Sequence, residues 1–112
     1  MEDFELPIQN LDAIDIVAKQ HDGTIDLVVV CSGPLDGSIE TLSRLERKVR
    51  GYLAEIQNPS FREEFGLVPP REARVIVACE HAVSALALGM IESLAREAGT
   101  QGVEVHHVVS LA

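Results

Sequence analysis

The order of hydrophobic and polar residues changes period along the chain, and these changes divide it into strands and helices. Residues 11–20 alternate between the two kinds, the period of two that a half-buried strand shows. Residues 24–31 are almost continuously apolar and rich in β-branched side chains, which is typical of a buried strand. Between them stand Asp22 and Gly23, a strong turn signal because glycine takes a positive φ at no steric cost. We therefore predict a β-hairpin.

Two later segments have the period of an amphipathic helix. The first has Ser38 as its candidate N-cap and ends at Asn58 and Pro59, and the second covers about residues 82–98. The apolar stripe predicted for the first is Ile39, Leu42, Leu45, Val49, Leu53 and Ile56 with Tyr52 beside it, and for the second Val83, Leu86, Ala87, Met90, Ile91 and Leu94.

The opposite side of the first helix is predicted to face solvent. It carries acidic and basic residues at the spacings that favour ion pairs one turn apart, in the order Glu40–Arg44 and Glu46–Arg50. Arg47 and Lys48 complete a cluster of four basic residues. We interpret this cluster as a solvated helix face rather than as a docking patch.

The fold class predicted from the order of elements is α+β. Residues 73–79 have a buried-strand pattern, and residues 103–109 form the last strand, so a parallel strand pair joined by a helix is expected at this end of the chain. Residues 60–65 are expected to add one short helical turn. The predicted architecture is a two-layer sandwich, β-β-α-β-α-β, with both helices on one face of a four-stranded mixed sheet. The other face is expected to be semi-polar.

Length, composition and charge indicate the number of domains and the kinds of partner that are disfavoured. A chain of 112 residues with 46% hydrophobic residues predicts one domain, residues 1–112, in which residues 1–10 form an acidic arm. The formal charge of −9 disfavours nucleic acid and anionic membranes as partners. No secretory signal or long apolar segment is apparent, and the two cysteines are expected to be thiols, so a cytoplasmic location is predicted.

Spaced residues along the chain resemble a family of small bacterial domains that is known only as a domain of unknown function. The resemblance implies the same α+β sandwich and implies no activity. The residues that carry it are Ile14 and Asp15, Gly23, Leu35 and Asp36, Lys48, Tyr52 and Leu53, and Ile56.

The candidate chemistry lies where two strands each lead into a helix. If these strands are parallel, Cys31 and Asp36 lie at the same sheet edge as Cys79, Glu80 and His81, beside two helix N-termini. A cysteine near a histidine and a carboxylate has the elements of an activated nucleophile. Cys79, Glu80, His81 and Asp36 are therefore the candidate catalytic or ligand-binding residues.

Core packing is the competing interpretation of both cysteines. Cys31 continues the strand phase of Leu27 and Val29, and Cys79 continues that of the valines before it. Free cysteine is among the most buried residue types and packs as a small hydrophobe. We favour core packing over a reactive thiol.

The histidines and cysteines lack the spacing of a metal site. Cys79 and His81 are too close in sequence to resemble a structural zinc motif, and His21 is a turn residue. His106 and His107 point to opposite faces of one strand, and His107 is expected to be the buried, hydrogen-bonded one. We predict no metal and no cofactor.

Three carboxylates and one glycine-containing loop are not interpreted as catalytic or nucleotide-binding groups. Asp12, Asp15 and Asp26 on the hairpin are expected to protect an edge strand against unwanted pairing rather than to perform acid–base chemistry. The loop 32–37 lacks the Gly-Lys-Ser/Thr ending of a phosphate loop, so nucleotide hydrolysis is rejected.

The function expected from the sequence is binding rather than catalysis. The uncovered face of the predicted sheet carries apolar residues among its charges, which favours a domain that forms a homodimer or binds another protein or a small molecule. The alternative is a small enzyme or ligand-binding module that uses the loops at Asp36 and at Cys79, Glu80 and His81.

Overall fold

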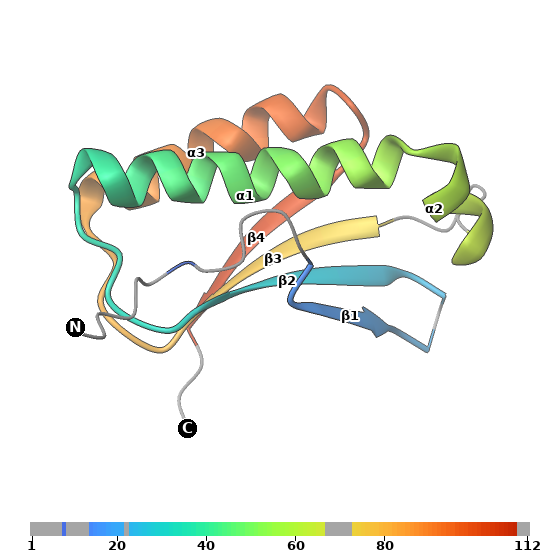
Figure 1. The fold of residues 1–112 in the computed structure, drawn as a ribbon, viewed down its shortest axis with the longest axis horizontal. Coiled ribbons are helices and arrows are strands. Elements are labelled where there is room, and N and C mark those ends of the chain that lie inside the picture. Colours follow the sequence, from blue (N-terminus) through green and yellow to red (C-terminus); the bar gives the residue numbers. More distant parts are fainter. Residues whose placement is uncertain (1–7, 9–13, 22, 67–72, 110–112) are drawn as a thin grey trace, which may run out of the picture.

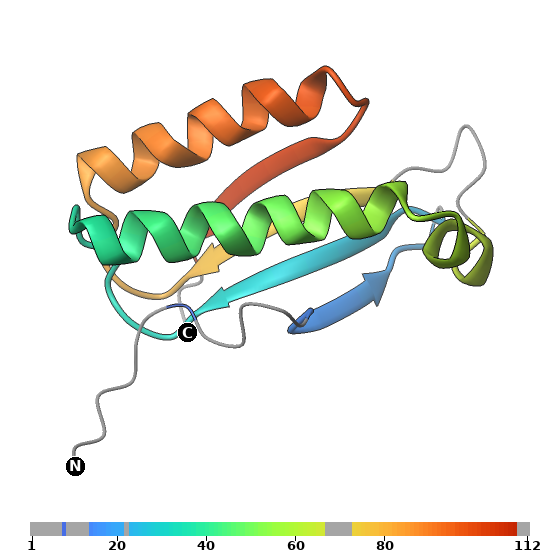
Figure 2. The same cartoon turned by 45° about the horizontal axis from the view of Figure 1, so that its top comes forward.

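A four-stranded sheet with helices packed on one face forms the described part of the chain, as Figures 1 and 2 show. The structure is a computed structural model and describes residues 8, 14–21, 23–66 and 73–109. The elements in chain order are β1 (Ile16–Lys19), β2 (Ile25–Cys31), α1 (Ile39–Gln57), α2 (Pro59–Glu64), β3 (Ala73–Cys79), α3 (Ala85–Gly99) and β4 (Glu104–Val109).

The strands lie in the order β1-β2-β3-β4, and the sheet is mixed. β1 pairs antiparallel with β2, whereas β2 with β3 and β3 with β4 pair in parallel. Each parallel pair is connected through a helix, and both crossovers place their long helix on the same side of the sheet. The predicted α+β fold and the mixed sheet are therefore confirmed, and α2 is the short helical turn expected after the first long helix.

The hairpin turn forms where the sequence predicts it. Gly23 has a φ of 91°, a backbone conformation that residues other than glycine rarely adopt. The amide of Gln20 donates to the carbonyl of Thr24 at 2.8 Å and closes the turn. Asp22 and residues 11–13 lie outside the described residues. Within them, β1 covers Ile16–Lys19, which is shorter than the predicted strand.

The face that α1 buries includes Thr41 and Lys48, which the predicted stripe lacks, and leaves out Ile39. Ile39 is 86% exposed because it occupies the first turn, outside the arc that packs on the sheet. Lys48, which we expected on the solvated side, is 0% exposed. It follows Leu45 by three residues and precedes Tyr52 by four, and this spacing places it on the buried face.

The second long helix begins later than predicted, at Ala85. Leu35 and Val83 form an isolated parallel bridge, in which Leu35 donates to the carbonyl of Ala82 at 2.9 Å and Ser84 donates to the carbonyl of Leu35 at 2.8 Å. This bridge holds residues 82–84 extended, and Ser84 then caps the helix. Leu86, predicted to be buried, is 64% exposed; the buried residues of α3 are Ala87, Ile91, Leu94 and Ala98.

None of the helices in the described residues has the length and hydrophobicity needed to cross a membrane.

Candidate functional site

The two strand-to-helix loops meet at one edge of the sheet, as the sequence predicts. The Leu35–Val83 bridge joins them, and Ser38 and Ser84 cap α1 and α3 at the same end of the helix layer. Each serine hydroxyl accepts a hydrogen bond from the third amide of its helix, that of Thr41 or Ala87. These two donors of the helix N-termini are therefore used within the chain.

Asp36 lies exposed on the first of these loops. Its carboxylate accepts hydrogen bonds from the amide of Ser38 at 3.1 Å and from the hydroxyl of Ser38 at 2.7 Å. These bonds from Ser38 lower the pKa of Asp36, because they favour the ionised carboxylate. In this arrangement Asp36 orients the residue that caps α1.

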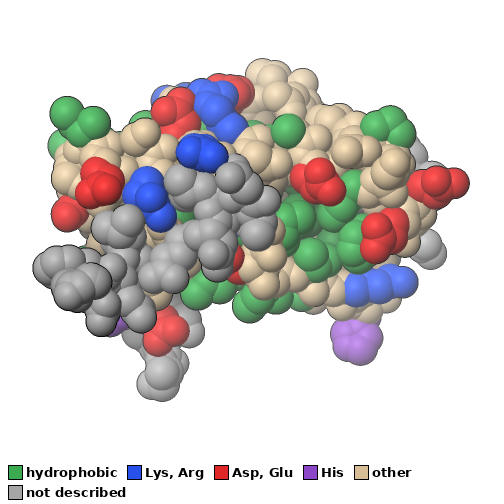
Figure 3. All heavy atoms as spheres, in the orientation of Figure 1, with side chains coloured by type: hydrophobic (Ala, Val, Ile, Leu, Met, Phe, Trp, Pro, Cys, Tyr) green, Lys and Arg blue, Asp and Glu red, His purple; other side chains and the backbone are tan. Residues whose placement is uncertain are grey.

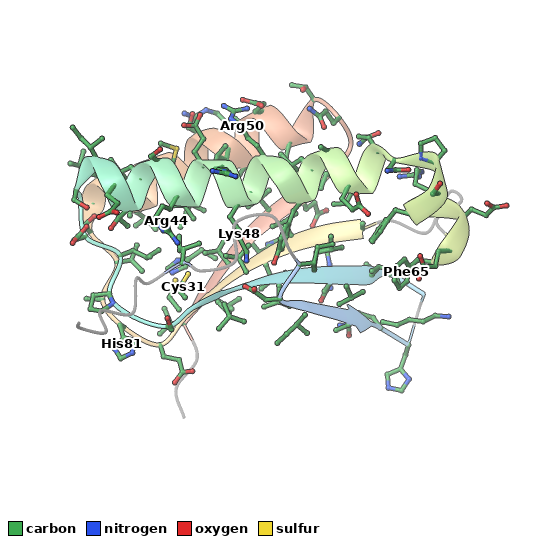
Figure 4. All side chains as sticks on the ribbon, in the orientation of Figure 1. Cys31, Arg44, Lys48, Arg50, Phe65 and His81 are labelled. Atoms are coloured by element: carbon green, nitrogen blue, oxygen red, sulfur yellow. The ribbon has the colours of Figure 1, made fainter. Side chains whose placement is uncertain are left out.

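The other three candidate residues diverge at the end of β3. Cys79 is 0% exposed and points into the core, whereas Glu80 and His81 are exposed in the following bend. Figure 4 places His81 on the loop, away from the layer between α1 and the sheet. Glu80 and His81 also precede the first residue of α3 by five and four positions, so the expected location of these two residues beside a helix N-terminus is wrong.

Cys31 and Cys79 form a buried thiol pair, which confirms that both pack in the core. They are register partners on the adjacent parallel strands β2 and β3 and share a hydrogen bond. This bond and burial raise the pKa of Cys31, whereas the bond lowers the pKa of Cys79.

Beside the thiols, Lys48 makes a buried ion pair with Asp15. The Nζ atom of Lys48 lies 2.8 Å from Oδ1 of Asp15, and the side chain points from α1 toward the sheet, as Figure 4 shows. The second carboxylate oxygen of Asp15 accepts a hydrogen bond from the amide of Val30 at 2.9 Å. Asp15 therefore joins the helix layer to β2 just before β1 begins.

Tyr52 extends this polar cluster by one helical turn. Its hydroxyl donates to the carbonyl of Val28 at 3.0 Å and accepts from the amide of Asp15 at 2.8 Å. The Nζ atom of Lys48 lies 5.8 Å from the centre of its ring, within the range of a cation–π contact. Burial raises the pKa of Tyr52 to about 12.

This cluster of Asp15, Lys48 and Tyr52 is a buried polar feature that the sequence did not predict. The signal was present as spacing, since Lys48 and Tyr52 are four residues apart on one helix face. Their partner is far away along the chain: Asp15 lies 33 residues before Lys48. A local pattern does not reveal such a pair.

Arg44 anchors one residue of the predicted N-terminal arm. Its guanidinium donates two hydrogen bonds, of 2.9 and 2.6 Å, to the carbonyl of Ile8. The side chain of Ile8 is 0% exposed and belongs to the core. Arg44 is thus half-buried and structural instead of belonging to a solvated face.

The sheet face opposite the helices, which we call the open face, has no cover among the described residues. Register places its residues in rows across the strands. Figure 3, in the orientation of Figure 1, views the sheet from its β1 side with the helix layer above, so the open face points downward. The open face consists of the apolar residues Ile16, Ala18, Val28, Val30, Ile76, Ala78 and Val108 and of the polar residues Asp26, Arg74, Glu104 and His106.

The polar residues of the open face pair with one another at one end of the sheet. The guanidinium of Arg74 contacts both carboxylate oxygens of Asp26, at 2.9 and 3.1 Å. Gln20 donates to the same carboxylate at 3.0 Å, and a ring nitrogen of His106 lies 2.7 Å from Glu104. The opposite end of the face is apolar.

Asp26 therefore has a different role from the one predicted. It lies on β2, an interior strand with neighbours on both sides, so it does not protect a sheet edge. Asp15 is engaged by Lys48, and Asp12 lies outside the described residues.

His107 faces the helix side of the sheet, as its strand phase predicts. It is half-buried, but its Nε2 atom has no hydrogen-bond partner within the described residues, contrary to our expectation. Across the described ranges, no three histidine, cysteine, aspartate or glutamate side chains come together in a way that could hold a metal ion.

Two hollows lie away from the loop edge. A groove of about 470 Å³ runs between α1 and α3, where Arg50 and Glu97 form an ion pair across it. A smaller hollow of about 220 Å³ lies at the polar end of the sheet. The groove is lined by Arg50, Leu53, Ala54, Gln57, Glu97 and Gln101, and the smaller hollow by Thr24, Ala73, Arg74, Gly102 and Glu104.

Comparison of the chain with known protein families, with curated proteins and with solved structures finds no match. The resemblance to the family of unknown function stays a prediction.

Proposed function

We propose that this protein is a small binding domain that self-associates through the open face of its sheet. The observation that carries the proposal is that the helices cover only one side of the sheet, so apolar side chains remain in contact with solvent on the other. Val30 is 38% and Val108 41% exposed, and Ile16 is 49% exposed. Contiguous exposed apolar residues on a sheet favour an interaction surface.

The distribution of residue types on the open face supports a protein partner. Protein interfaces combine an apolar centre with a polar rim. Here Val30, Ala78 and Val108 form one row, and the ion pair of Asp26 and Arg74 lies two rows away. Two copies that meet through the apolar rows leave the charged rows at the edge of the contact.

The charged residues of the open face are paired within the chain, which favours a second copy as the partner. The whole chain has a formal charge of −9, which makes two copies repel each other. On the open face, however, the carboxylate of Asp26 is matched by Arg74, and Glu104 contacts His106. This surface therefore adds little repulsion, and symmetric dimers are the commonest oligomers of soluble proteins.

Sedimentation velocity over a range of concentrations tests the proposal. We expect the wild-type chain to shift from 12.2 kDa toward twice that mass as its concentration rises, and Val108→Lys to stay monomeric. Leu88→Lys is the matched control, because Leu88 is 37% exposed on α3, away from the sheet face. It should associate like the wild type. A monomer at every concentration, or equal association of all three proteins, contradicts the proposal.

A ligand-binding or catalytic module at the loop edge is the second candidate. Asp36, Glu80 and His81 are exposed there, on the two loops that lead into α1 and α3. The support is weaker, because Ser38 and Ser84 occupy helix donors and Asp36 is engaged by Ser38.

A further inference from the structure

We propose that Cys31 and Cys79 are an oxidisable dithiol, a modification site at which a small oxidant such as hydrogen peroxide forms an intramolecular disulfide. The proposal is independent of self-association, because both thiols lie on the helix side of the sheet and the open face is on the other.

Backbone register brings the two sulfurs within reach of each other. Cys31 and Cys79 are direct partners on neighbouring parallel strands, and such strands lie about 4.8 Å apart. A disulfide joins residues whose Cα atoms are about 4.4–6.8 Å apart, so no strand has to move far. The side chains of in-register partners project from the same face, and here the two thiols already share a hydrogen bond.

The asymmetry of the pair assigns a different role to each thiol. The hydrogen bond with Cys31 lowers the pKa of Cys79 and so favours its thiolate. Cys31 keeps its proton, since the same bond and burial raise its pKa. Cys79 is therefore the thiol that reacts first, and Cys31 is the one that resolves the product.

The reaction balances with peroxide as the only oxidant. The Cys79 thiolate attacks one peroxide oxygen, the O–O bond breaks, and hydroxide leaves and takes a proton to become water; Cys79 is then a sulfenic acid. The sulfur of Cys31 attacks the sulfur of Cys79, and the hydroxyl leaves with the Cys31 proton as a second water. Two thiols have lost two electrons, and peroxide has gained them.

Burial selects the kind of oxidant. Cys31 is 2% and Cys79 0% exposed, so a reagent must be small to reach them in the folded protein. Hydrogen peroxide meets this requirement, whereas a bulky aromatic disulfide does not. Slow reaction of the folded chain with a bulky thiol reagent therefore agrees with the proposal, provided that peroxide still reacts.

The test is peroxide treatment of the full folded chain, followed by alkylation in denaturant and mass spectrometry. We expect the wild type to lose two hydrogens, to resist alkylation, and to yield a peptide pair that links Cys31 to Cys79 and separates on reduction. In Cys31→Ala, Cys79 should gain oxygen atoms, because no resolving thiol remains. In Cys79→Ala, Cys31 should stay an alkylatable thiol at the same dose.

Three results would overturn the proposal. One is a wild-type chain whose cysteines both remain alkylatable after peroxide. Another is a disulfide that links two chains instead of one. The third is equal oxidation of the two alanine variants. The linked peptides are measured on the wild type, so this readout does not depend on whether the variants fold.

Discussion

Lys48 is the residue whose surroundings depart most from those usual for its type. Lysine is almost never fully buried unless it is paired, and Lys48 is 0% exposed with its Nζ atom against Asp15. Asp15 retains some contact with solvent and also accepts the amide of Val30. The two partners of this ion pair therefore do not depend on each other equally.

Removing Asp15 should therefore cost more stability than removing the charge of Lys48. Asp15→Ala should lower the free energy of unfolding by about 3–5 kcal/mol, because it removes the carboxylate that faces a buried ammonium. Lys48→Met keeps the apolar stem and leaves a partly hydrated carboxylate, so it should cost only about 1–2 kcal/mol. Urea unfolding followed by circular dichroism measures both.

Arg47→Met is the control for a change of charge on the same helix, since Arg47 is exposed. It should alter the free energy of unfolding by no more than about 0.5 kcal/mol. Equal losses in Asp15→Ala and Lys48→Met would show that the burial of Lys48 does not govern the energetics of the pair.

At the scale of elements, Tyr52 joins α1 to the hairpin. Its hydroxyl contacts Val28 on β2 and the amide of Asp15 next to β1, so one side chain connects the helix layer with two strands. The bond to Val28 requires the phenol proton, and the bond from Asp15 requires the phenol oxygen. Burial disfavours the ionised phenolate. The stability of the contact between helix and hairpin is therefore linked to pH.

The direction of this linkage follows from the raised pKa. In the unfolded chain Tyr52 ionises near its ordinary pKa of 10.0, whereas in the folded chain its pKa is about 12. The protonated Tyr52 therefore stabilises the folded state fully below pH 10. This stabilisation, about 2–3 kcal/mol, is lost as the pH rises to about 12. Tyr52→Phe should remove this part of the pH dependence.

The measurement is unusually direct, because Tyr52 is the sole tyrosine and the chain has no tryptophan. The ultraviolet absorbance of the phenolate should rise near pH 12 in the folded protein and near pH 10 in urea. Titration at the same pH in both states would refute the buried contact.

The sequence predicts an element well when neighbouring residues determine it, and poorly when a contact with a distant segment does. The strands, the hairpin turn at Gly23 and the N-cap Ser38 were predicted, because each rests on neighbouring residues. The start of α3 was not, because the bridge from Val83 to Leu35 delays it. Such a bridge joins segments that are far apart in the sequence.

The same distinction between local and distant causes applies to the candidate site. The gathering of two loops at one sheet edge was predicted from parallel pairing, and so was the burial of Cys31 and Cys79. The partners of Lys48 and Asp26 were not, because a charged residue on a helix or strand is assigned to solvent unless its distant counterion is known. Hydrophobic periodicity carries no information about that counterion.

At the scale of the whole molecule, the distribution of helices leaves one face of the sheet without cover among the described residues. Both long helices lie on one side of the sheet, and the open face carries an apolar end and a self-paired charged end. The net charge of −9 keeps the rest of the surface repulsive between copies. Association is therefore expected through this face and should be strengthened by salt, which screens that repulsion.

Methyl NMR spectra at increasing protein concentration report on self-association through the open face residue by residue. We expect concentration-dependent shifts for the methyl groups of Val30, Ile76 and Val108 on the open face. The exposed methyl groups of Leu86 and Leu88 on α3 should stay unchanged. Shifts confined to α3, or no shift at any concentration, would contradict self-association through the open face.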